Sequence, residues 1–159
     1  MDINVTGTRS RYVKDVIQQA ADFYSTILLT KKMSSTIVLD VYLKKTLEDD
    51  AYGFCESIIN TPEFKTFSIE LLRTGKLSEI LTTLAHEMVH VSQFARGVLS
   101  ADAPGWAFKW KRSIYQLETK SMTQYANLPW EKEALSMERD LFRQYQRTYK
   151  DTFEDVDVA

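Results

Sequence analysis

The chain has 159 residues, enough for one compact domain with its own core and too few for two. Hydrophobic residues make up 44% and charged residues 26%, which excludes a disordered chain, and the net charge of −2 excludes nucleic-acid binding driven by bulk charge. The single cysteine, Cys55, excludes an internal disulfide framework and is expected to be a small buried apolar residue.

The N-terminal residues 1–5 lack the basic segment and apolar stretch of a signal peptide. The longest apolar segments are far shorter than a membrane span. We therefore expect a soluble cytoplasmic protein that has no membrane partner.

The first half of the chain predicts one helix followed by three strands. Residues 36–43, 52–59 and 64–72 are short, rich in β-branched and aromatic residues, and separated by turn signals, as strands are. The helix is predicted over residues 11–29, because apolar side chains recur there at steps of three and four residues. These apolar residues are Val13, Val16, Ile17, Ala20, Phe23, Tyr24 and Ile27.

The second half predicts two longer helices. One begins near Ser78, a good N-cap residue, and ends at Gly97. Aromatic and basic residues alternate over 105–115, which favours two short strands. Pro129 suits the first turn of a helix, and residues 130–149 are expected to continue it.

This order predicts an α+β fold in a single domain over residues 1–150. It has an N-terminal helix, a small and mainly antiparallel sheet, and two later helices. Residues 151–159 are acidic and are expected to form a frayed, solvated tail.

The motif HEMVH occupies residues 86–90. His86 and His90 are four residues apart, so on a helix both imidazoles leave the same face and can reach one zinc ion at about 2.0–2.1 Å. Glu87 is rotated by about a hundred degrees from His86 and can reach a water in the open coordination position. Zinc lowers the pKa of that water, and Glu87 can take the proton and return it to a leaving amine.

The helix around the motif supports a site that faces a cleft. The chain has only two histidines, and both lie in the motif. An apolar stripe lies nearly opposite them on the helical wheel, so one face can enter the core while both histidines remain accessible. The stripe consists of Leu77, Leu81, Leu84, Met88, Val91 and Ala95.

A catalytic zinc site needs a third protein ligand. No further histidine exists, and Cys55 precedes the helix in a strand-like segment, so a carboxylate is required. Glu131 and Glu133, at the start of the last helix, are the best candidates. Two helical steps separate them by about two hundred degrees, so only one of them can be the ligand.

These motifs resemble the gluzincin branch of zinc metallopeptidases, in which HExxH is followed some forty residues later by a glutamate in a helix. The segment PWEKEA over 129–134 and the pair Trp110-Lys111 resemble small phage and bacterial metallopeptidases, and the likeness covers residues 64–140. It implies a zincin-like fold with Glu87 as general base. The Glu-x-x-Ala spacing of that family favours Glu131 over Glu133 as the ligand that joins His86 and His90. A virus-encoded copy would act in the host cytoplasm.

The resemblance also implies that residues 64–72 form a sheet edge, to which an extended peptide could add as a further strand. Tyr125 and Tyr115 are candidates for polarising the peptide carbonyl, although packing is the commoner role of a tyrosine. Many gluzincins place an Asp or Asn four residues after the ligand Glu to orient a histidine. Here that position is Leu135, or Met137 if Glu133 is the ligand, so the orienting carboxylate has no visible source.

Two aromatic and basic features have simpler interpretations. The three tryptophans, at positions 106, 110 and 130, either close the core or form a wall of the cleft. Lys109, Lys111 and Arg112 form a short basic cluster that is expected to be solvated rather than to bind nucleic acid.

The sequence therefore predicts a zinc metallopeptidase that acts on a peptide or protein. The catalytic residue is Glu87, and the zinc ligands are His86, His90 and Glu131. The alternative is a zincin-like module that binds a peptide or partner and cleaves it weakly or not at all. The retained Glu87 argues against the alternative, because a purely structural zinc site needs no base.

Overall fold

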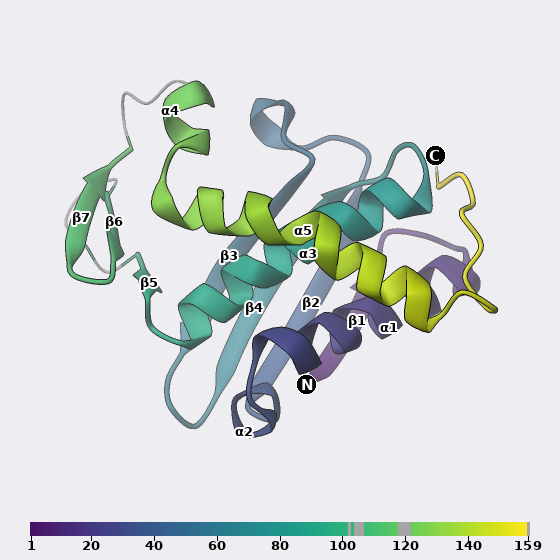
Figure 1. Ribbon diagram of the computed structural model, residues 1–159, viewed down its shortest axis with the longest axis horizontal. Helices are drawn as coiled ribbons and strands as arrows, with labels where there is room; N and C mark the ends of the chain where they lie inside the picture. The colour runs from purple at the N-terminus through teal and green to yellow at the C-terminus, as the bar shows by residue number, and fades with distance from the viewer. Residues whose placement is uncertain (102, 104–106, 118–121, 159) are drawn as a thin grey trace.

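The computed structural model describes residues 1–101, 103, 107–117 and 122–158. A four-stranded sheet forms one layer, and the three long helices lie together in front of it (Figure 1). These helices are α1 (Arg11–Leu28), α3 (Leu77–Ala95) and α5 (Pro129–Thr148). In Figure 1, α5 crosses over α3, which brings the start of α5 over the second half of α3. The predicted α+β class is confirmed.

The sheet has the strand order β1-β2-β4-β3 and is mixed. β1 pairs with β2, and β2 with β4, in parallel, whereas β3 runs antiparallel to β4. The strands are β1 (Asp2–Thr6), β2 (Ile37–Lys44), β3 (Gly53–Asn60) and β4 (Lys65–Leu72). The expectation of a mainly antiparallel sheet is wrong for this sheet. The unforeseen strand β1 pairs in parallel with β2 after a helical crossover, and β4, rather than β3, lies next to β2 and is also parallel to it.

The position of the sheet edge also differs from expectation. The last strand before α3 is β4, which lies between β2 and β3, so the sheet edge that contacts α3 belongs to β3. In β4, Phe67, Ile69 and Leu71 are fully buried while the intervening residues are half-buried. Such alternation reports that one face of a strand is covered. It does not report whether a second strand pairs on either side.

Helix α1 forms where the apolar stripe predicted it. The Ser10 hydroxyl caps its first turn by accepting a hydrogen bond from the Val13 backbone N–H at 3.3 Å. Val13, Ile17 and Tyr24 are buried against the sheet and α3, and the Tyr24 hydroxyl donates to the Leu81 carbonyl oxygen. This bond ties α1 to the helix that carries HEMVH.

Helix α3 is capped by the end of the chain. The Asp155 carboxylate accepts hydrogen bonds from the Ser78 backbone N–H and hydroxyl, each at 2.8 Å. Asp157 forms an ion pair with Lys76 at 3.2 Å, and Val158 is buried. The acidic segment expected to be a solvated tail is therefore docked on α3, because its carboxylates occupy the positive end of a helix that has no good N-cap of its own.

A small antiparallel sheet, here called the arm, stands at one end of the domain beside the short helix α4 (Met122–Ala126) (Figure 1). The arm consists of β5 (Leu99–Ser100), β6 (Ala107–Trp110) and β7 (Ser113–Gln116). β6 and β7 confirm the two strands expected in this region, apart from positions 105 and 106, which lie outside the described residues. Trp106 is among those undescribed positions, so its expected role is untested.

Two short helical segments complete the chain: α2 (Lys31–Ser34), and the single turn η1 (Glu48–Asp50) between β2 and β3. Among the described residues, no helix has both the length and the apolar character that crossing a membrane requires.

Candidate metal site

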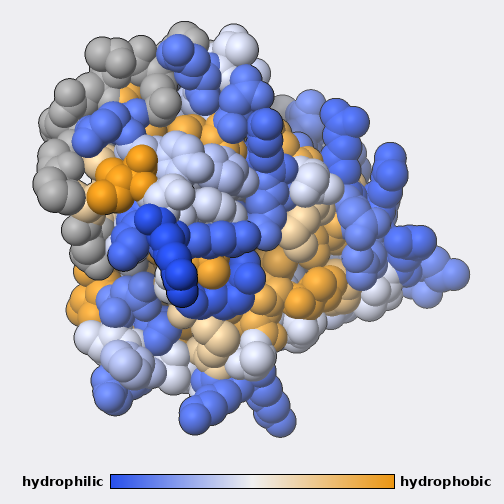
Figure 2. Space-filling view, turned by 60° about the vertical axis from the view of Figure 1, so that its left-hand side comes forward, coloured by the Kyte–Doolittle hydropathy of each residue, from blue (hydrophilic) through white to orange (hydrophobic). Residues whose placement is uncertain are grey.

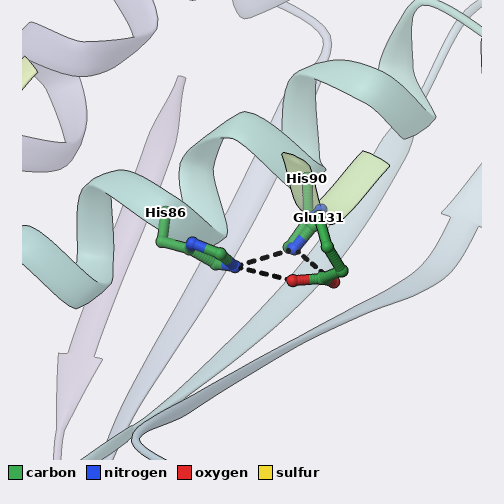
Figure 3. Close-up of side chains that lie close together, drawn as sticks. All are labelled: His86, His90 and Glu131. Carbon is green, nitrogen blue, oxygen red and sulfur yellow. Dashed lines mark hydrogen bonds and ion pairs between the residues drawn. The ribbon is translucent and has the colours of Figure 1, made fainter. Parts of the chain in front are cut away.

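Three side chains converge where α5 crosses α3. His86 and His90 come from successive turns of α3, and Glu131 comes from the first turn of α5 (Figure 3). The Nε2 atoms of the two histidines are 3.2 Å apart, and each is 3.1 Å from one oxygen of the Glu131 carboxylate. Ligands held about 2.0–2.1 Å from a tetrahedral ion are about 3.3 Å from one another, so the group could hold a metal ion.

The outer nitrogen of His86 faces a carboxylate. His86 Nδ1 lies 2.9 Å from Glu138 Oε2, and an ionised carboxylate can only accept a hydrogen bond. The Nδ1 atom of His86 therefore carries its proton. The neutral ring then presents the lone pair of Nε2 to His90 and Glu131, which is the tautomer that a metal ligand needs.

The outer nitrogen of His90 faces an amide whose orientation is fixed. The Nε2 group of Gln93 donates one hydrogen bond to the Trp130 carbonyl oxygen at 3.0 Å and another to Glu133 at 2.7 Å. The Oε1 atom of Gln93 therefore points at His90 Nδ1, 2.8 Å away, and accepts its proton. As with His86, the lone pair of His90 Nε2 is left facing the centre of the group.

Two lone pairs and a carboxylate thus meet at one buried point, an arrangement that a cation stabilises. Burial alone would lower the pKa of His86, but its hydrogen bonds to Glu131 and Glu138 outweigh this and raise that pKa to about 10. Burial would likewise raise the pKa of Glu131, but its hydrogen bonds to both histidines lower it to about 2. In the absence of a metal, a proton held by the histidines supplies the positive charge.

Glu131 and Glu133 have different partners. Glu131 contacts both histidines and is buried. Glu133 lies on the far side of Gln93, where it accepts a hydrogen bond and approaches Arg96 at 3.8 Å. The structure thus brings Glu131, and not Glu133, into the His86/His90 group.

Glu87 lies beside the group, between α3 and the edge strand β3. It is buried, and burial raises its pKa, opposed by the nearby charges of His90 and His86. Gly53 in β3 leaves room for Glu87: a Cβ atom there would come within 2.7 Å of both Glu87 Oε1 and Thr83 Cγ2. The glycine therefore permits the close approach of Glu87 to the strand, since a Cβ atom there would displace the Glu87 and Thr83 side chains.

The group opens into a cavity of about 640 Å³, which is in the usual range for a ligand site. Its walls are strand β3, the face of α3 that carries the histidines, the start of α5, helix α4 and the arm. Cys55, on the inward face of β3, also lines it, and burial raises the pKa of its thiol well above the usual value. Trp130 is buried and also lines the cavity, so it both packs in the core and forms part of the cavity wall.

The two candidate tyrosines are in different environments. Tyr125 of α4 lines the cavity, and burial together with the adjacent Glu131 carboxylate raises the pKa of its hydroxyl. Tyr115 of β7 instead packs edge-on against Trp130, with ring centroids 5.4 Å apart. Tyr125 is therefore the tyrosine near the metal group.

Sequence reasoning missed Glu138 and Gln93. Glu138 is seven residues after Glu131, so both project from one face of α5, two turns apart. Gln93 is three residues after His90 and lies on the face of α3 that α5 covers. The family pattern directed attention to position 135, where Leu135 is half exposed. The signal that could have identified Glu138 is its seven-residue spacing from Glu131, which places both carboxylates on one face of the helix.

Comparison with models of protein families, with curated proteins and with solved structures finds no match to this chain.

Proposed function

We propose that this protein is a zinc-dependent peptidase. The observation that carries the proposal is that a buried His86/His90/Glu131 group opens into a cavity whose wall also holds an acidic residue, Glu87. A set of two imidazoles and one carboxylate suits zinc, and a site with three protein ligands keeps one position open for a reactant. When bound, zinc polarises a peptide carbonyl and lowers the pKa of a water molecule towards neutrality.

Glu87 acts as the proton carrier in this proposal. Its buried carboxylate interacts electrostatically with both histidines and Glu131, so it lies close to the reacting centre. A pKa raised by burial brings a carboxylate nearer to the range in which it can take a proton and then release it at neutral pH. Glu87 would take a proton from the attacking water and deliver it to the leaving amine.

The free edge of β3 would hold the substrate. The Leu72 N–H donates to the Tyr52 carbonyl oxygen at 2.8 Å, and hydrogen-bonded pairs alternate along an antiparallel ladder. The backbone groups of Gly53 and Cys55 therefore point away from β4, towards the open side of the strand. An extended peptide could pair with them and lie across the metal group. In this proposal the strand that pairs with the peptide is β3, and not residues 64–72, for which the family resemblance implied that position.

Tyr125 is the proposed stabiliser of the developing oxyanion. Its hydroxyl interacts with the Glu131 carboxylate, which raises the pKa of the hydroxyl. An O–H donor so close to a ligand carboxylate could turn towards a peptide carbonyl oxygen and donate to it.

The proposal is tested by incubating zinc-loaded protein with a mixture of unfolded protein-derived peptides and identifying new ends by mass spectrometry. We expect wild type to cleave and Glu87→Gln to lose about 100-fold or more in rate while it keeps its zinc. Glu63→Gln, at an exposed turn, is the matched control and should cleave as wild type does. Equal cleavage by Glu87→Gln and wild type would refute the role of Glu87. Zinc-loaded wild type that binds peptides without cleaving any would instead favour the binding module.

A further inference from the structure

The outer surface of the arm carries a cluster of positive charge. Lys109 in β6, and Lys111 and Arg112 in the turn that joins β6 to β7, are all exposed. None of the three forms an ion pair with another described residue, and strands β5, β6 and β7 contain no acidic residue. Three positive charges without a negative partner therefore gather on one hairpin of a protein whose net charge is −2.

An apolar side chain is exposed beside these cations. Ile114 of β7 lies directly opposite Lys109 of β6 in the antiparallel pair, so both project from the same face of the hairpin. Ile114 is 58% exposed. On the side of the molecule that carries the arm, apolar patches lie between hydrophilic side chains (Figure 2). The surface formed by Lys109, Lys111, Arg112 and Ile114 is here called the basic patch.

The opposite face of the same hairpin is anchored to the domain. Phe108 and Tyr115 form a cross-strand pair and pack on Trp130, with ring centroids 5.8 and 5.4 Å from the Trp130 ring. The Lys111 N–H donates to the Val98 carbonyl oxygen at 2.7 Å, which holds the turn close to the end of α3. The basic patch is therefore presented by a supported hairpin, so that little conformational entropy is lost when a partner binds.

Lys111 occupies a backbone position that favours other residues. Trp110 pairs with Ser113, so Lys111 and Arg112 form a two-residue hairpin loop. The φ angle of Lys111 is 54°, a left-handed conformation in which Gly or Asn is preferred because a Cβ atom is crowded there. The Lys111 Nζ atom is 5.7 Å from the Trp110 ring centroid, and such a contact at an exposed site is weak. A residue that departs from the local backbone preference in this way indicates a functional role for its side chain.

The basic patch lies on the outside of a cavity wall. Leu99 and Phe108 line the cavity, whereas Lys109 follows Phe108 in the strand and projects from the other face. The cavity and the basic patch therefore use opposite faces of one short strand. A protein substrate long enough to pass the edge of the arm could contact both surfaces.

We propose that the basic patch binds an acidic segment of the protein substrate, in which Asp or Glu side chains flank an apolar residue. Carboxylates pair with lysine and arginine, and Ile114 offers an apolar contact beside those pairs. That the segment belongs to a substrate rests on the proposed function. A nucleic acid is disfavoured, because three cations neutralise few phosphates and the net charge of the protein is negative.

The test is binding of a fluorescently labelled peptide, Glu-Glu-Leu-Glu-Glu, to zinc-loaded Glu87→Gln protein at about 0.15 M salt. Gln-Gln-Leu-Gln-Gln and a single-stranded oligonucleotide of the same charge as the Glu peptide are the comparison ligands. Reversal of the patch charges in Lys109→Glu/Lys111→Glu/Arg112→Glu should weaken binding of the Glu peptide about tenfold or more. The matched control, Lys31→Glu/Lys32→Glu/Lys150→Glu, reverses three exposed lysines on α2 and after α5 and has the same net charge. It should bind within about twofold of the unreversed protein, because distant charges are screened at this salt concentration.

A single substitution separates binding from folding. Lys111→Gly removes one charge of the basic patch and relieves the left-handed backbone. It should weaken binding of the Glu peptide about two- to fivefold and raise the melting temperature by about 1–4 °C. A lower melting temperature with unchanged binding would show that this lysine serves the fold, and would overturn its role in binding.

Equal affinity for the Glu and Gln peptides, equal losses in the two triple variants, or tighter binding of the oligonucleotide than of the Glu peptide would overturn the proposal. Thermal melting of each variant checks that it is folded. Cleavage by zinc-loaded wild type of one peptide with and without the acidic segment is measured separately. Binding lost only on reversal at the arm, without cleavage of either peptide, would keep the basic patch and reject the peptidase. Cleavage of both peptides with equal kcat/KM would do the reverse.

Discussion

The two halves of α5 place opposite kinds of side chain on one helical stripe. Glu131, Glu138 and Tyr145 are spaced seven residues apart and share a face. The first two lie against the histidines of α3, whereas Tyr145 is fully buried among aromatic rings. Those rings are Phe23, Tyr24, Tyr149 and Phe153.

The two halves show that the position of a residue in the helical repeat determines whether its side chain is buried. The position does not determine which interaction makes that burial favourable. The aromatic half is stabilised by removal of apolar surface from water, with or without a metal. The acidic half buries charge, which is favourable only when a cation or a full set of hydrogen bonds accompanies it. The aromatic half should therefore hold α5 in place, and the acidic half should hold the ion.

The largest expected effect is on stability, at the aromatic half. Tyr145→Ala should reduce the free energy of unfolding of the zinc-free protein by about 3–5 kcal/mol, because it removes a fully buried ring and leaves a cavity. Denaturant unfolding measures this. The folded fraction should still bind zinc with the wild-type stoichiometry. A folded Tyr145→Ala protein without zinc binding would show that the two halves are not separable.

At the acidic half, Glu138→Ala should weaken zinc binding about 10–100-fold with little loss of stability. The His86 ring would lose the carboxylate that fixes its tautomer. Competition with a fluorescent zinc chelator measures the dissociation constant. Asp140→Asn, an exposed position on the same helix, is the control and should bind zinc as wild type does. Equal affinities for both variants would remove Glu138 from the site.

A smaller effect is expected at Glu133, which acts on His90 only through Gln93. Glu133→Ala should weaken zinc binding by less than about tenfold, because Gln93 keeps its hydrogen bond to the Trp130 carbonyl oxygen. The same chelator competition applies. A loss as large as that of Glu138→Ala would mean that Glu133 has a more direct role than its position indicates.

The pH dependence of zinc binding probes the charge of the acidic half. The pKa of His86 is raised to about 10 in the zinc-free protein, so at pH 7 zinc must displace its proton. Calorimetry in buffers of different ionisation enthalpy should therefore record release of about one proton per zinc at pH 7, and the affinity should rise with pH up to about 10. Zinc binding without proton release would contradict this electrostatic account.

The raised pKa of His86 also determines how the stability of the zinc-free protein changes with pH. A pKa raised above the unfolded value of about 6.5 contributes stability that is complete below that pH. That contribution is lost as the pH rises through about 10. Unfolding of zinc-free protein between pH 6 and 11 should show this decline.

Local patterns predicted the parts of the site that lie within one element. The HEMVH helix, the stripe that buries Leu81 and Met88, and the long helix after Pro129 all follow from spacing along the chain. Glu131 was preferred over Glu133 because of a family spacing, and the helix crossing places it beside the histidines.

Features that depend on how distant segments meet were not predictable in this way. The strand order depends on the position of β4 between β2 and β3, and on β1, whose five residues bury only Ile3 and so carry little pattern. The contact of Glu138 with His86 depends on the crossing of α5 over α3. The docking of Asp155 on α3 depends on where the chain returns after α5. The seven-residue spacing of Glu131 and Glu138 places both on one face of α5, but it does not say which helix that face meets, and the other two features leave no periodic signal in the sequence.

The proposal that His86, His90 and Glu131 bind zinc is best tested by the zinc content and affinity of purified wild type, measured beside Glu131→Ala and Glu133→Ala. These two variants remove the same chemical group from neighbouring positions of one helix. We expect about one zinc per wild-type molecule, loss of that zinc in Glu131→Ala, and its retention in Glu133→Ala. Retention by Glu131→Ala with loss in Glu133→Ala, or a wild type that takes up no zinc, would contradict the proposal.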